Sequence, residues 1–196
     1  MARNLADQPL HDVLSAFAAA LPTPGGGSAC AAASAIGAAL LMKAASVAAV
    51  PQHALAAIEA QLADAIDDDA AAYQDVLAAR KQPRDSQEER ALRRAAVQRA
   101  LRHATDVPLA IMRLSAEALT EARSLAPRVH RSMFADVTVA VTLLHAGFEG
   151  ARATVDANLN GLDDAEHAAR VRDEGHLLSE KAEQGADEAR RILRMG

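Results

Sequence analysis

Residues 28–50 read SACAAASAIGAALLMKAASVAAV, a segment in which about half of the residues are alanine and only Lys43 is charged. Alanine loses no side-chain entropy in a helix, so this composition favours α-helix over strand. The segment is long and apolar enough to be mistaken for a membrane span. Alanine contributes little to membrane insertion, however, and serine and glycine residues interrupt the apolar run. We therefore predict a buried central helix and no membrane partner.

The composition of the whole chain indicates the same fold class. Hydrophobic residues make up 51% of the 196 residues, but aromatic residues make up only 2%. A sheet-rich protein would contain more β-branched and aromatic side chains. The length suits one domain, which we expect to span residues 1–196. The prediction is an all-α fold: a compact multi-helix bundle with an Ala-rich central helix and long antiparallel helices.

The charge and the cysteine content exclude some classes of partner and site. The net charge is −5, which argues against a nucleic-acid partner. Cys30 is the single cysteine, so no internal disulfide can form, and we expect structural packing for it. With no signal peptide apparent, a cytoplasmic location is expected. The seven histidines show no metal-ligand spacing, so no metal site is predicted.

Hydrophobic spacing and stop signals predict the remaining helices. They are expected over residues 10–21, 52–80, from Ser86 to at least residue 119, over 135–160, and in a polar last segment capped by Asp163. Ser86 and Glu89 have the spacing of a capping box. Pro108 removes one helical hydrogen bond, so a kink without a break is expected there.

The first candidate site is Gly25-Gly26-Gly27-Ser28, which follows two prolines and leads into the Ala-rich helix. Free N–H groups at a helix start attract anions, and glycine lets a ligand approach the backbone closely. The alternative is a tight turn in which Ser28 caps the helix.

The second candidate is Asp67-Asp68-Asp69 in the predicted third helix. At 100° per residue, Asp69 lies within the apolar stripe that includes Tyr73, Asp67 lies off its centre, and Asp68 points away. A carboxylate aimed inward is costly unless it is paired or hydrogen-bonded. Asp69 is therefore expected either to pair with a neighbouring helix or to act as a catalytic or ligand-binding acid.

The fifth predicted helix carries further candidates. Asp136 lies in its first turn, where it either complements the helix dipole or contributes to a site. Asn158 lies near its end. We expect His145 to be a core histidine and Glu149 and Arg152 to form an exposed pair.

Four segments together resemble the cyclodeaminase/cyclohydrolase family, which contains the C-terminal domain of formiminotransferase-cyclodeaminase and stand-alone bacterial methenyltetrahydrofolate cyclohydrolases. They are PTPGGGS at 22–28, IDDDAAAY at 66–73, ATDVPL at 104–109, and the stretch 136–159 that ends in Asn158-Leu159. Their order and spacing match over residues 8–165.

The resemblance implies an all-helical fold, a homodimer, and a tetrahydrofolate one-carbon substrate with no tightly bound cofactor. It also implies a site that draws on the glycine loop, the acidic helix and the fifth helix. The residues that match are Pro24, Gly25, Gly26, Gly27, Ser28, Asp67, Asp69, Asp136 and Asn158.

The resemblance favours hydrolysis of the methenyl bridge of methenyltetrahydrofolate to the 10-formyl form. In this hypothesis Asp69 is the acid/base, Asp136 its electrostatic partner, and Asp67 a lesser catalytic candidate. The first alternative is cyclodeamination of formimidoyltetrahydrofolate with loss of ammonia. The second is a non-catalytic helical binding or scaffold domain, since the chain departs from the family pattern at Ala135, at Ala153 and in the Pro51-Gln52-His53 segment.

Overall fold

A computed structural model describes residues 4–195 of the chain. Within that range the protein consists of six α-helices and three short 3-10 helices, with no strand, which confirms the all-α class. The α-helices are α1 (Leu10–Ala18), α2 (Gly26–Val47), α3 (His53–Arg80), α4 (Gln87–Leu125), α5 (Phe134–Leu159) and α6 (Ala165–Met195). The 3-10 helices are η1 (Leu5–Asp7), η2 (Ala126–Arg128) and η3 (Arg131–Met133).

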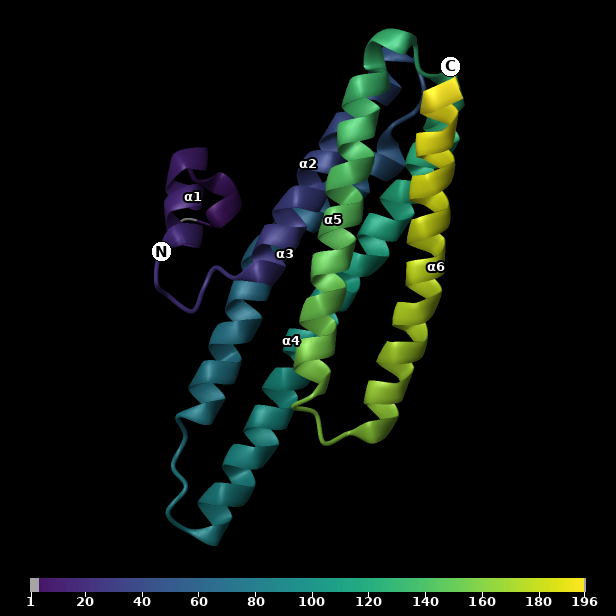
Figure 1. Ribbon diagram of the computed structural model, residues 1–196. Helices are drawn as coiled ribbons and strands as arrows, with labels where there is room; N and C mark the ends of the chain where they lie inside the picture. The colour runs from purple at the N-terminus through teal and green to yellow at the C-terminus, as the bar shows by residue number, and fades with distance from the viewer. Residues whose placement is uncertain (1–3, 196) are drawn as a thin grey trace.

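The long helices form an elongated bundle (Figure 1). Helix α2 packs against α3, α5 and, less extensively, α4, while α6 packs against α4 and α5. The hairpin of α3 and α4 extends beyond the connection between α5 and α6 (Figure 1). The first helix, α1, lies to one side of the bundle and contributes no buried residue.

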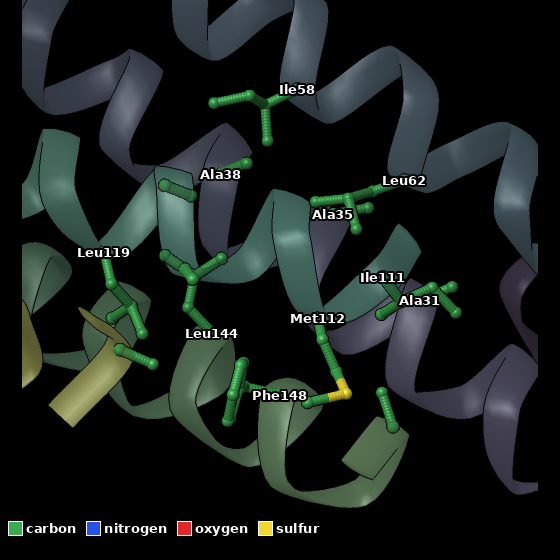
Figure 2. Packing of buried hydrophobic residues seen from close by; sticks show 14 of the residues in the cluster. Ala31, Ala35, Ala38, Ile58, Leu62, Ile111, Met112, Leu119, Leu144 and Phe148 are labelled. Atoms are coloured by element: carbon green, nitrogen blue, oxygen red, sulfur yellow. The ribbon is translucent and has the colours of Figure 1, made fainter. Parts of the chain in front are cut away.

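Small residues let α2 and α5 pack closely. A Cβ atom on Gly37 would lie 2.8 Å from Leu144 Cγ, and one on Gly147 would lie 2.0 Å from Ser34 Oγ. The hydroxyls of Ser34 and Ser115 share a buried hydrogen bond of 2.8 Å, so these polar groups are satisfied inside the bundle. Leucine, isoleucine, methionine and phenylalanine side chains from α3, α4 and α5 fill the space around the alanines of α2 (Figure 2).

Helix α2 is buried on one side only, whereas a helix that is apolar all round is expected to be buried on every side. Its inner face lies in the core, but Ile36 is 52% exposed and Val47 57% exposed. Among the described residues, α2 is the one helix long and apolar enough to cross a membrane. Its packing against three helices of the bundle fits the predicted core helix instead.

Most predicted boundaries hold within two or three residues, and the Ser86–Glu89 capping box is present. Helix α4 continues through Pro108 without a break. One alternative interpretation and one predicted cap are wrong. Gly25, not Ser28, is the N-cap of α2, and the Ser28 hydroxyl donates a hydrogen bond to α3 instead of capping the helix. The carboxylate of Asp164, not of Asp163, accepts a hydrogen bond from the amide of His167 in the first turn of α6.

Candidate functional site

A cavity of about 240 Å³ opens where the glycine loop meets the bundle. Its walls come from the loop before α2 and from α2, α3, α4 and α5. The lining residues are Pro22, Thr23, Gly25, Gly26, Gly27, Asp69, Tyr73, Ala104, Thr154 and Asn158. The structure therefore brings the glycine loop together with one aspartate of the acidic cluster and with the end of the fifth helix.

Asp69 is the carboxylate of this cavity. Its Oδ2 accepts hydrogen bonds from the Ser28 amide at 2.8 Å and from the Ser28 hydroxyl at 3.0 Å. Asp68, its neighbour, is exposed, as the helical geometry predicts. The described residues give Asp69 no cationic partner, so Asp69 is held by hydrogen bonds from the start of α2 and not by an ion pair.

The close contact between α2 and α3 depends on Gly27. A Cβ atom at this position would lie 2.0 Å from Asp69 Oδ1 and 2.5 Å from its Cγ. At Gly26, one residue earlier, a Cβ atom would meet nothing within 4 Å. Glycine is therefore required at position 27 so that the carboxylate can reach the helix start.

Burial raises the pKa of Asp69 above its ordinary value of 3.8, while the two hydrogen bonds from Ser28 oppose this shift. A carboxyl group with a raised pKa exchanges protons more readily near neutral pH, which suits an acid/base. Burial, and next the charge of Asp69, also raise the pKa of Cys30, so its thiol stays protonated. Cys30 packs against Gly150 on α5, in line with the structural role predicted for it.

The part of the cavity wall formed by α5 carries an amide and a hydroxyl. Asn158 lines the cavity, and its side-chain amide donates a hydrogen bond of 2.6 Å to the Ala104 carbonyl on α4. Thr154 lies one turn before Asn158 on the same face of α5. On the loop side, Gln74 donates a hydrogen bond of 3.0 Å to the Thr23 hydroxyl.

Two residues of the matched loop motif lie just outside the lining. Pro24 follows a cis peptide bond after Thr23 and is not part of the cavity wall. Ser28 is fully buried and contacts the site through Asp69.

Two predicted catalytic residues do not belong to the cavity formed by one chain. Asp67 accepts a hydrogen bond of 2.9 Å from the Leu5 amide, so it holds the N-terminal segment against α3. Asp136 lies at the other end of α5 from Asn158, roughly 33 Å away at 1.5 Å per helical residue. There it forms an ion pair with Lys43 on α2, with a nitrogen–oxygen distance of 2.7 Å. The separation already follows from the predicted helix over 135–160, because positions 136 and 158 are 22 residues apart.

His145 is not the core histidine we expected, because it is partly exposed and its Nε2 lies 3.1 Å from a Glu183 carboxylate oxygen on α6. The Glu149–Arg152 pair is present. His145, Glu149 and Glu183 offer ligand atoms within 4.8 Å of one another, the kind of set that could hold a metal ion. In the structure, however, His145 and Arg152 already partner these carboxylates.

Sequence reasoning missed five cavity residues: Pro22, Thr23, Tyr73, Ala104 and Thr154. Thr154 could have been found, because it precedes Asn158 by one helical turn. Tyr73 was assigned to the apolar stripe of the third helix, yet its side chain lines the cavity. Ala104 has no chemical signal of its own, since the backbone carbonyl contributes its hydrogen bond.

Comparisons with known proteins agree with the motif-based resemblance. The sequence model of the family described as formiminotransferase-cyclodeaminase matches residues 9–176. A methenyltetrahydrofolate cyclohydrolase from Methylorubrum extorquens is 32% identical over 189 residues, which cover 89% of this chain and 90% of that protein. The formimidoyltransferase-cyclodeaminase of Rattus norvegicus is 30% identical over 97% of this chain, which spans 37% of that longer protein.

The fold also has a solved counterpart. A formiminotetrahydrofolate cyclodeaminase from Thermotoga maritima superimposes with a TM-score of 0.86 and covers 96% of both chains. At 22% sequence identity, this likeness establishes the shared fold and no more.

Proposed function

The chain belongs to the formiminotransferase-cyclodeaminase family, and we propose that its own reaction is hydrolysis of the methenyl bridge of 5,10-methenyltetrahydrofolate to 10-formyltetrahydrofolate. The family consists of folate-processing cyclohydrolase and cyclodeaminase enzymes that act on tetrahydrofolate derivatives. Similarity to the Methylorubrum extorquens cyclohydrolase extends over nearly the full length of both proteins, which supports the hydrolytic reaction.

The placement of Asp69 is the observation that carries this proposal. It is the one carboxylate among the cavity-lining residues, and burial raises its pKa. The methenyl bridge is a cationic amidinium carbon joined to N5 and N10 of the folate. A carboxylate beside it stabilises the cation and accepts a proton from the attacking water.

The reaction then proceeds in two proton-coupled steps. Water adds to the bridge carbon as Asp69 takes one of its protons, which gives a neutral tetrahedral adduct. Asp69 returns that proton to N5 as the C–N5 bond breaks, and the adduct hydroxyl loses its proton to solvent as the formyl group forms on N10. One water is consumed and one proton is released.

The remaining cavity residues bind and orient the substrate. The Gly25–Gly27 backbone offers N–H groups to an oxygen or carboxylate of the folate. Asn158, fixed by the Ala104 carbonyl, presents its amide oxygen to a ring N–H. These groups need no tightly bound cofactor, since the folate itself carries the one-carbon unit.

The second candidate reaction is cyclodeamination of 5-formimidoyltetrahydrofolate. In that reaction N10 of the protonated formimidoyl compound attacks the formimidoyl carbon and loses its proton to Asp69. Asp69 passes this proton to the amino group, which leaves as ammonia, so the same bridged folate is formed. The name of the rat relative favours this reaction, although that protein is much longer.

Two assays on the purified chain test the proposal. Methenyltetrahydrofolate is followed by its loss of absorbance against buffer alone, and formimidoyltetrahydrofolate is followed by ammonia release. Faster loss of the methenyl form supports the cyclohydrolase, whereas ammonia release without hydrolysis supports the cyclodeaminase. Inactivity with both substrates, together with no folate binding by calorimetry, would favour a non-catalytic helical binding or scaffold domain.

A further inference from the structure

Tyr73 is placed unusually for a residue on the apolar stripe of its helix. Nearby stripe residues Ile66 and Val76 are buried, but Tyr73 is 39% exposed and its side chain lines the cavity. Removing an aromatic ring from water is favourable, so an aromatic side chain left open to a cavity has apolar surface that a ligand can cover.

Aromatic side chains are otherwise scarce in this protein. The chain contains one tyrosine, three phenylalanines and no tryptophan. Phe148 is buried in the core, and Tyr73 is the aromatic residue among those that line the cavity. Within one chain, a contact between a planar ligand and an aromatic ring lining this cavity must therefore involve Tyr73.

Tyr73 also stands next to the reactive carboxylate. Asp69 and Tyr73 are four residues apart on α3, so their side chains are neighbours on one helix face. The glycine backbone of Gly26, where a Cβ atom would meet nothing within 4 Å, leaves open space on the loop side of the cavity. A flat ring that covers Tyr73 consequently has its edge beside Asp69.

We propose that Tyr73 is the stacking surface for the fused pterin-derived ring system of the tetrahydrofolate substrate. This inference rests on the proposed function, since it names the substrate contact that holds the bridge carbon beside Asp69. The conjugated pyrimidinone ring stacks on the phenol, and the cationic methenyl bridge is attracted to the electron-rich ring face. Tyr73 is thus a binding residue, which contributes to substrate affinity through the ring system.

The single tyrosine makes the contact directly observable. Protein in which tyrosine is replaced by 3-fluorotyrosine should give one ¹⁹F resonance, which reports on position 73 alone. The stable analogue 5-formyltetrahydrofolate and a pterin without the tail should both shift that resonance. The tail fragment p-aminobenzoylglutamate should leave it unchanged. A shift caused by the tail fragment and not by the pterin would overturn the assignment.

Kinetics provide the second readout. Stacking of a base on an aromatic side chain contributes substantially to binding affinity. Tyr73→Leu should therefore raise KM roughly 10- to 100-fold with kcat little changed. Tyr73→Phe keeps the ring and should keep KM within about twofold of the wild type. Leu177→Ala removes an exposed apolar side chain on α6, away from the cavity, and serves as the matched control.

The two proposals fail in different ways. If the wild-type protein neither binds nor converts any folate, the proposed function is wrong. If it converts folate but Tyr73→Leu has an unchanged KM and the ¹⁹F resonance stays in place, only the stacking role of Tyr73 is wrong.

Discussion

Asp69 and Gly27 form one unit although they lie on different helices. The carboxylate reaches the first turn of α2 because position 27 has no side chain, and it accepts two hydrogen bonds from Ser28 there. This arrangement satisfies the third amide of α2 and complements the positive end of the helix dipole. It also orients one carboxylate oxygen toward Ser28, which fixes the group at the edge of the cavity.

Asp69→Asn should lower turnover by roughly 10²- to 10⁴-fold, since it removes a positioned proton-transfer group. Asparagine retains an oxygen that can accept the Ser28 hydrogen bonds, so the melting temperature should change little. Asp68→Asn, one residue away and exposed, should leave both quantities unchanged. Turnover and thermal unfolding are measured on the same three proteins. A stable and fully active Asp69→Asn protein would exclude Asp69 from catalysis.

Gly27→Ala should damage both stability and activity. The added Cβ atom would lie 2.0 Å from Asp69 Oδ1, so either the carboxylate or the helix start must move. Overpacking of this kind costs about 1–3 kcal/mol, which lowers the melting temperature by roughly 2–4 °C per kcal/mol in a domain of this size.

Gly26→Ala is the matched control for stability, because the new methyl group meets nothing within 4 Å. Its melting temperature should equal or slightly exceed that of the wild type, since alanine is the better helix former. Wild-type stability and turnover in Gly27→Ala would show that Asp69 is not held as the structure describes.

At the scale of a helix, the C-terminal end of α2 places an alanine in a backbone conformation that alanine disfavours. Ala49 has a positive φ of 53°, and the amides of Ala49 and Val50 donate to the carbonyls of Ser46 and Ala45. These are the two hydrogen bonds of a Schellman motif, whose left-handed position is usually glycine. Alanine can occupy it only at the steric cost of its Cβ atom.

Ala49→Gly should therefore stabilise the protein by about 0.5–1 kcal/mol, the reverse of most glycine substitutions. Ala48→Gly, at φ −81°, offers no such relief and should be neutral or destabilising. Chemical denaturation of the two variants against the wild type measures the difference. Equal destabilisation by both glycines would contradict the strain assigned to Ala49.

At the scale of the molecule, one apolar face has no partner among residues 4–195, which the structure describes. Ile36 and Val47 on α2 and Val139 on α5 are each at least half exposed, and α1 beside them exposes Leu10 and Leu14. Ala-rich helices bury little area each, so a second copy is a natural cover for this face. Light scattering should give about twice the 20.5 kDa chain mass. A monomer at micromolar concentration would refute the homodimer.

The same dimer would give Asp136 a way to reach the site. Ile36 lies midway along α2 between Ser28 and Lys43. A two-fold axis near Ile36 would therefore bring the Lys43–Asp136 pair of one copy beside the cavity of the other.

In such a dimer, Asp69→Asn and Asp136→Asn should each be inactive alone. Mixed by co-refolding, they should recover up to about a quarter of wild-type activity, since half the dimers hold one intact site. Full activity of Asp136→Asn alone would remove Asp136 from the mechanism.

Local chemistry was enough to predict much of this protein. The α-helices follow from local features: the alanine content, the Ser86–Glu89 capping box and the helical spacing of apolar residues. Backbone entropy and capping hydrogen bonds both act within a few residues. The same periodicity placed Asp69 inward and Asp68 outward, since both directions follow from rotation about a single helix. The family motifs likewise named the glycine loop, Asp69 and Asn158 as parts of one site.

Only the tertiary structure decided which of these residues meet. Asp136 pairs with Lys43 on α2, and Asp67 is engaged by Leu5 while Asp69 faces the cavity. Tyr73 satisfies the apolar period of α3, but the position of the glycine loop leaves its ring open to the cavity. Periodicity fixes the direction of a side chain from its own helix axis. What lies in that direction depends on how separate helices pack, which is set by contacts between residues distant in sequence, such as Gly27 with Asp69.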